Sequence, residues 1–137
     1  MSFILKPGKN SAWLKRELKN LLTSVILHGK IETSSSLVKN NKKNNLTKLL
    51  AKFVGLAKKA NKEPEKKQCF YRSALRLVNI PKKDNKTKQK EKKILNLSKS
   101  FDDLGKKYQS RSGGYSRVIK LGSRNGDNSL RVIFALC

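Results

Sequence analysis

Residues 111–127 read RSGGYSRVIKLGSRNGD, and residues 130–136 follow as LRVIFAL. In the second run, apolar side chains at 130, 132, 134 and 136 share one side, which is the period of a β-strand packed on one face. The first run alternates less regularly, because Val118 and Ile119 are both apolar. Asn125-Gly126, between the runs, is a dipeptide typical of hairpin connections. The sequence therefore predicts a C-terminal β-hairpin.

Arginine is concentrated in this hairpin segment. Four of the seven arginines of the chain lie within residues 111–137, whereas lysine dominates the other basic positions. A planar guanidinium can bind two phosphate oxygens at once, but lysine is a flexible point charge. We therefore expect phosphate contacts from Arg111, Arg117, Lys120 and Arg124, the alternative being a solvated basic loop. Tyr115 at the strand start either stacks on a base or packs into the core.

Upstream of the hairpin, apolar residues recur at helical spacing in four segments. These run from Ser11 to about His28, from Leu46 to about Asn61, from Pro64 to about Val78, and from Ile94 to Tyr108. Lys30 to Ser34 reads as a short strand or extended segment. The pattern predicts a two-layer α+β fold, with about four helices packed on a small antiparallel sheet, a C-terminal β-hairpin and basic extensions.

The length of 137 residues suits a single domain. We expect a basic arm at 1–10, one domain over 11–137, and within it a lysine-rich loop at 82–93. That loop contains no apolar side chain, so it is either a solvated linker or a segment ordered by RNA. Residues 39–45, rich in lysine and asparagine, are poor helix material.

The net charge of +24 calls for a polyanionic partner. Nucleic acid is the first candidate, because neutralised phosphates release condensed counterions. An anionic membrane surface is the competitor, since the Leu46 to Ala57 segment is a basic amphipathic helix; its apolar face is better explained as part of a core. The chain has no run of roughly 18–20 apolar residues that would span a bilayer and no signal peptide, so we expect it to stay in the cytoplasm.

The sequence offers little for catalysis or metal binding. Cys69, Cys137 and His28 lack zinc-ligand spacing, and we expect reduced thiols and no cofactor. Asp102 and Asp103 are adjacent, so on a helix they point about 100° apart and cannot flank one substrate. We expect neither an enzyme nor a small-molecule substrate.

Two blocks resemble the bacterial large-subunit ribosomal protein numbered seventeen. The first spans residues 8–33, with an opening helix and the step Lys30-Ile31-Glu32-Thr33. The second is residues 111–127, where Gly-Gly-Tyr, Arg, Lys-Leu-Gly and Arg-x-Gly-Asp fall at the family's intervals. Residues 39–45 and 82–93 depart from the family pattern, so RNA contacts there are not inferred.

The resemblance implies a structural protein of the large ribosomal subunit in the cytoplasm. It would bind large-subunit ribosomal RNA near the exit of the nascent-chain tunnel and abut neighbouring large-subunit proteins, with no membrane partner. A non-specific nucleoid-type binder is the alternative. The expected RNA-contacting residues are Lys6, Lys9, Asn10, Ser11, Lys15, Arg16, Lys19, Arg111, Tyr115, Arg117, Lys120 and Arg124.

Overall fold

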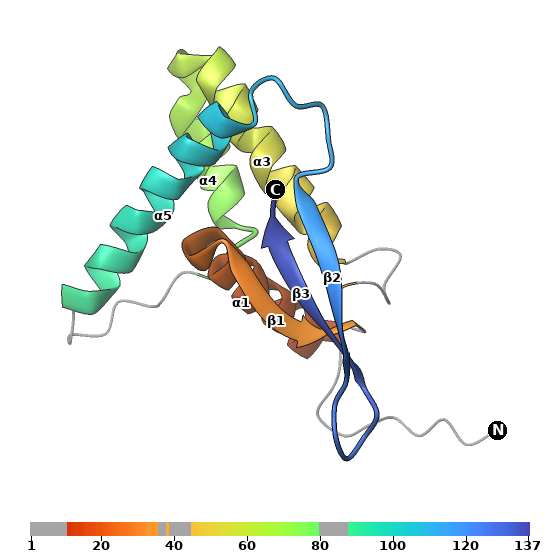
Figure 1. The fold of residues 1–137 in the computed structure, drawn as a ribbon. Coiled ribbons are helices and arrows are strands. Elements are labelled where there is room, and N and C mark those ends of the chain that lie inside the picture. Colours follow the sequence, from red (N-terminus) through yellow and green to blue (C-terminus); the bar gives the residue numbers. More distant parts are fainter. Residues whose placement is uncertain (1–10, 36–37, 39–44, 80–87) are drawn as a thin grey trace.

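The computed structural model describes residues 11–35, 38, 45–79 and 88–137. Its elements are α1 (Ser11–His28), β1 (Lys30–Ser34), α3 (Leu46–Lys62), the short 3-10 helix η1 (Pro64–Lys66), α4 (Lys67–Leu75), α5 (Lys88–Lys107), β2 (Ser116–Ser123) and β3 (Leu130–Leu136). The expected α+β fold, with a C-terminal hairpin and a strand after the first helix, is confirmed (Figure 1). The expected arm at 1–10 lies outside the described residues.

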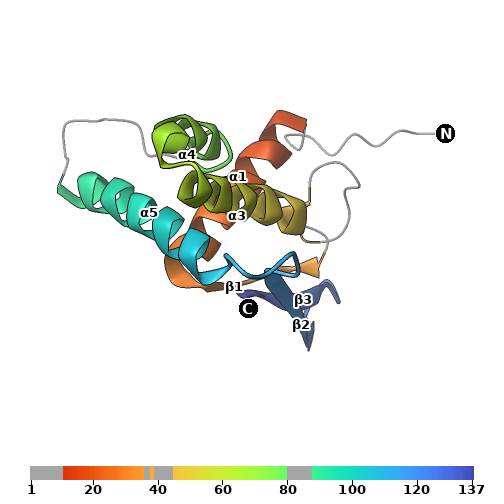
Figure 2. The same cartoon turned by 90° about the horizontal axis from the view of Figure 1, so that it is seen from above.

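The three strands form one antiparallel sheet in the order β1-β3-β2. Val132 and Phe134 of β3 are fully buried and define the inner face of the sheet, which packs on the helices. The intervening positions, including Arg131 and Ile133, lie on the opposite face, which we call the outer face. Figure 2 shows the helices gathered on one side of the sheet, so the outer face stays uncovered by them.

The helices bury the apolar stripes that the sequence predicts. In α3 the stripe enters the core with Leu50, Phe53 and Val54 fully buried, as expected for a core helix. The Phe53 ring meets Phe101 of α5 edge to face at a centroid distance of 5.5 Å, and Tyr71 of α4 meets the same ring at 5.4 Å. No helix in the described part of the chain combines the length and apolarity needed to cross a membrane.

The contact between α3 and α5 requires a glycine. A Cβ on Gly105 would lie 2.8 Å from the backbone oxygen of Ala57 and 2.5 Å from the amide nitrogen of Asn61. Both of these belong to α3, so the two helix backbones approach each other closely at this point. A side chain at 105 would push them apart.

Helix boundaries follow local chemistry, with two corrections. The side chain of Asn45 accepts a hydrogen bond from the N–H of Lys48 at 3.0 Å and caps α3, which therefore begins at Leu46 as expected. The helix after Pro64 was expected to reach Val78, but α4 ends at Leu75, and Val78 is buried just after the turn that follows the helix.

The second correction concerns the lysine-rich loop expected at 82–93. Helix α5 begins at Lys88, so residues 88–93 are helical. Lysine, glutamine and glutamate are good helix formers, and their intrinsic preference extends the amphipathic helix backwards despite the like charges. Residues 80–87 lie outside the described part.

Candidate nucleic-acid interface

The hairpin loop joins β2 and β3 through residues 124–129 and projects beyond the helices (Figure 1). The N–H of Arg124 donates to the oxygen of Ser129 at 2.9 Å, and the N–H of Asn128 donates to the oxygen of Arg124 at 3.1 Å. Gly126 (φ 103°) and Asn128 (φ 52°) take left-handed conformations, which glycine and asparagine tolerate best. The expected hairpin connection at Asn125-Gly126 is confirmed, and its backbone bonds hold the loop in a defined shape.

Arg124 at the start of this loop is held by Asp127. Its Nε donates to Oδ1 of Asp127 at 3.1 Å, and its Nη2 donates to Oδ2. The N–H of Ser129 also donates to Oδ1 of Asp127 at 3.1 Å. These hydrogen bonds, with that from Arg124 the largest cause, lower the pKa of Asp127 from 3.8 to about 2, and the same bond raises the pKa of Arg124. Arg124, which the sequence predicts to bind phosphate, is therefore paired with the carboxylate of Asp127, a pair that the sequence analysis did not predict.

A second arginine and carboxylate pair lies on the outer face. Nη1 of Arg131 in β3 lies 3.4 Å from Oε1 of Glu32 in β1. Arg131 pairs with Ser34 in β1 and with Gly122 in β2, so it lies on the central strand between the other two. Sequence reasoning counted Arg131 among the arginines but did not predict it as a contact.

The expected contacts on β2 remain exposed to solvent. Arg117, Ala135 and Lys30 are in register across the three strands, which places both cations on the outer face. Lys120 is exposed on β2, an edge strand of the sheet; it pairs with Val132 and lies just before a bulge between Lys120 and Gly122. Neither Arg117 nor Lys120 has an ion-pair partner among the residues that the structure describes. They present unneutralised charge beside the hairpin loop.

Tyr115 belongs to the core. Its side chain is 9% exposed and its ring lies edge to face with that of Tyr108, at a centroid distance of 5.2 Å. The Tyr115 hydroxyl donates to the backbone oxygen of Arg111 at 3.3 Å, and Nζ of Lys58 donates to the same oxygen at 2.6 Å. These bonds fix the backbone at Arg111 while its side chain stays exposed. Because the Tyr115 ring is buried, we leave it out of the RNA-contacting set and keep Arg111.

The α1 residues form a separate group. Ser11, Lys15 and Arg16 are exposed and Lys19 is half-buried, while Leu18 and Leu22 of the same helix enter the core. Figure 2 shows the first turn of α1 across the helical layer from the sheet, so the start of this helix lies away from the hairpin. Lys6, Lys9 and Asn10 lie outside the described residues.

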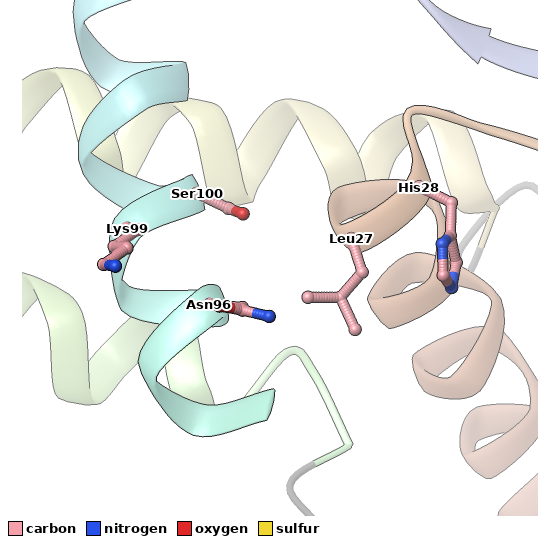
Figure 3. A pocket seen from close by; sticks show the side chains of 5 residues that line it. All are labelled: Leu27, His28, Asn96, Lys99 and Ser100. Atoms are coloured by element: carbon pink, nitrogen blue, oxygen red, sulfur yellow. The ribbon is translucent and has the colours of Figure 1, made fainter. Parts of the chain in front are cut away.

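A shallow hollow of about 410 Å³ lies between the end of α1 and the middle of α5. Asn96 and Ser100 point from α5 towards Leu27, whereas Lys99 points away (Figure 3). His28 ends α1, as expected, and its side chain lies at the rim of the hollow. No group of three or more histidine, cysteine or acidic side chains among the described residues could hold a metal ion. The residues that line the hollow bring together no catalytic set.

The described residues thus define a class: a strongly basic α+β protein with an exposed cationic sheet face and a rigid basic hairpin, the features of a nucleic-acid-binding protein.

Comparison with known proteins identifies the family. The sequence profile of the family described as "Ribosomal protein L17" matches residues 17–137. The chain is 33% identical over 136 residues to the large ribosomal subunit protein bL17 of Mesoplasma florum and 35% identical over 136 residues to that of Ureaplasma parvum, covering 99% of each chain. It is 30% identical over 135 residues to that of Listeria innocua, covering 96% of both chains. The chain belongs to the ribosomal protein L17 family, a family of structural proteins rather than enzymes.

Proposed function

We propose that this chain is a structural constituent of the large ribosomal subunit that binds large-subunit ribosomal RNA through phosphate contacts near the exit of the nascent-chain tunnel. Membership of the ribosomal protein L17 family and full-length similarity to large-subunit proteins support the ribosomal assignment. The location near the tunnel exit rests on the family resemblance alone. Neighbouring large-subunit proteins are the proposed protein partners.

One observation carries the RNA-binding part of the proposal. Arg117 and Lys30 are exposed on the outer face of the sheet, and Lys120 is exposed on the edge strand β2, next to a hairpin loop whose backbone is held by its own hydrogen bonds. A rigid basic projection of this kind loses little conformational entropy on binding, so its phosphate contacts contribute directly to affinity.

The mechanism is electrostatic and geometric. Where RNA segments converge, their phosphates repel one another, and a chain with net charge +24 neutralises them while its small core holds the cations in place. The start of α1 and the hairpin lie on opposite sides of the helical layer (Figure 2), so their basic residues would contact different RNA segments. The proposed action is to bridge RNA segments, and no reaction is involved.

Cosedimentation tests the proposal against the nucleoid-type alternative. The purified chain is added to large subunits stripped of it, and the subunits are washed at high salt and pelleted. The proposal expects the chain to stay with the subunits, because several shaped contacts act together. Release into the free pool at moderate salt, with equal binding to unrelated RNA, would favour non-specific binding.

A further inference from the structure

A second hollow lies at the base of the hairpin, between its loop and the strands β1 and β3. It has a volume of about 330 Å³ and is lined by Glu32, Thr33, Ser34, Arg124, Ser129 and Arg131. Arg131 faces Gly122 across the strand pair, and space is open where a side chain at Gly122 would begin. The hollow is therefore a donor-rich depression on the outer face, open to solvent.

The two guanidinium groups keep donors for a ligand. An arginine has five N–H donors, and Arg124 gives only Nε and Nη2 to Asp127. Arg131 gives only Nη1 to Glu32, at 3.4 Å. Among the described residues, no acceptor is bound to Nη1 of Arg124 or to Nε and Nη2 of Arg131. Thr33 and Ser129 also line this hollow.

The positive and negative charges at the hollow cancel, and this balance determines which kind of ligand the hollow can bind. Arg124 and Arg131 are balanced by Asp127 and Glu32, so the hollow has no net attraction for anions at long range. The uncompensated cations supply that attraction: Arg117 and Lys30 from the same face of the sheet, and Lys120 from the edge strand β2. The hollow then contributes oriented hydrogen bonds, which suit the tetrahedral oxygens of a phosphate.

We propose that this hollow binds one phosphodiester group of the RNA backbone, and that Asp127 is a positioning residue that holds Arg124 for it. The inference rests on the proposed RNA-binding function and deepens it. Asp127 joins the Arg124 side chain to the N–H of Ser129, so it ties the guanidinium to the loop backbone. Without it, Arg124 becomes a mobile side chain that must be ordered on binding.

For the substitution Asp127→Ala, the proposal predicts a change in RNA affinity opposite to the one expected from net charge alone. Asp127→Ala raises the net charge by one, which by electrostatics alone strengthens RNA binding. If Asp127 positions Arg124, the same change weakens binding by roughly tenfold, the effect of losing one charge-assisted hydrogen bond. The slope of log K against log salt also falls in magnitude, by up to about 0.7 to 0.9 if one phosphate contact is lost.

The experiment measures binding of the full chain to a large-subunit ribosomal RNA fragment at several salt concentrations. Asp103→Ala is the matched control, because it removes the same charge from an exposed position on α5. We expect Asp103→Ala to bind as tightly as the wild type or slightly more tightly, and Asp127→Ala to bind more weakly with a shallower slope. Thermal unfolding of each variant confirms that the fold is kept.

A double-mutant cycle tests whether both arginines bind the same phosphate. Arg124→Ala and Arg131→Ala should each weaken binding, and the double variant should lose less than the product of the two effects. Independent, multiplicative losses would overturn the shared site. Titration with inorganic phosphate, read at the Arg124 Nε–H resonance, separates the sources: a shift with phosphate but no RNA effect of Asp127→Ala would leave a site for free phosphate only and overturn the proposal.

The outcomes keep this inference apart from the proposed function. If the wild type shows no preference for ribosomal RNA, the proposed function fails. If the wild type shows that preference but Asp127→Ala binds as tightly as Asp103→Ala, only the positioning role and its phosphate site fail.

Discussion

Two glycine-to-alanine substitutions in the core helices should change stability in opposite directions. Gly105→Ala in α5 and Gly55→Ala in α3 each gain about 0.5 to 1 kcal/mol from reduced backbone entropy in a helix. The two substitutions differ in the space available for the added Cβ. A Cβ at Gly55 meets nothing within 4 Å, whereas a Cβ at Gly105 would lie 2.8 Å from the Ala57 oxygen.

The cost at Gly105 follows from what it meets. The Asn61 amide, at 2.5 Å, belongs to a side chain and can rotate away, but the Ala57 oxygen belongs to the α3 backbone and moves only with the helix. Overpacking of this kind costs about 1 to 3 kcal/mol, which exceeds the helix gain. We expect Gly105→Ala to lower the free energy of unfolding by up to about 2 kcal/mol, and Gly55→Ala to raise it by up to about 1 kcal/mol.

Urea unfolding followed by circular dichroism at 222 nm measures both changes. In a chain of this size each kcal/mol shifts Tm by about 3 to 5 °C, so thermal melts provide a second measure. Equal stabilisation by both substitutions would refute the close approach of α3 and α5 at Gly105. Destabilisation of Gly55→Ala would show that the open space at that position is not available.

Three further predictions concern the hairpin and its base. The Asp127 carboxyl should titrate at about 2 in an NMR pH series. Because this pKa is depressed, the contribution of the carboxylate to stability is complete above about pH 4 and is lost as the pH falls through 2. Titration near 4 would contradict the hydrogen bonds between Arg124 and Asp127. Tyr115→Phe removes the hydroxyl bond to Arg111 and should cost about 1 kcal/mol of stability while leaving RNA affinity and its salt slope unchanged; a large loss of affinity at equal stability would place Tyr115 at the RNA. Arg117→Ala should reduce the salt slope of RNA binding by about 0.7 to 0.9, and an unchanged slope would remove Arg117 from the phosphate contacts.

Periodicity predicted most of the fold because local patterns and packing agree. The stripe from Leu46 to Ala57 and the alternation from Leu130 to Leu136 are buried as their spacing indicates. The predicted helix boundaries were wrong in two places, where the apolar pattern alone did not show how far the helix extends. Residues 88–93 form the start of α5 rather than a loop, and Val78 is buried although it lies beyond the end of α4.

The ion pairs of the candidate site were harder to predict from the sequence, because they depend on strand register and on the shape of the loop. Glu32 and Arg131 are 99 residues apart and meet only through the β1 and β3 register. Arg124 and Asp127 are three residues apart, but their bond depends on the shape of the loop, with Gly126 and Asn128 at positive φ. Tyr115 illustrates the reverse case: its motif suggested an RNA contact, but the Tyr108 ring beside it places it in the core.

Competition binding tests the central claim most directly. A labelled fragment of large-subunit ribosomal RNA is bound by the full chain, and unlabelled ribosomal or unrelated RNA of equal length is added at rising salt. We predict that ribosomal RNA competes at lower concentration than unrelated RNA and that this preference persists as salt weakens the non-specific contacts. Equal competition by the two RNAs at every salt concentration would contradict the account.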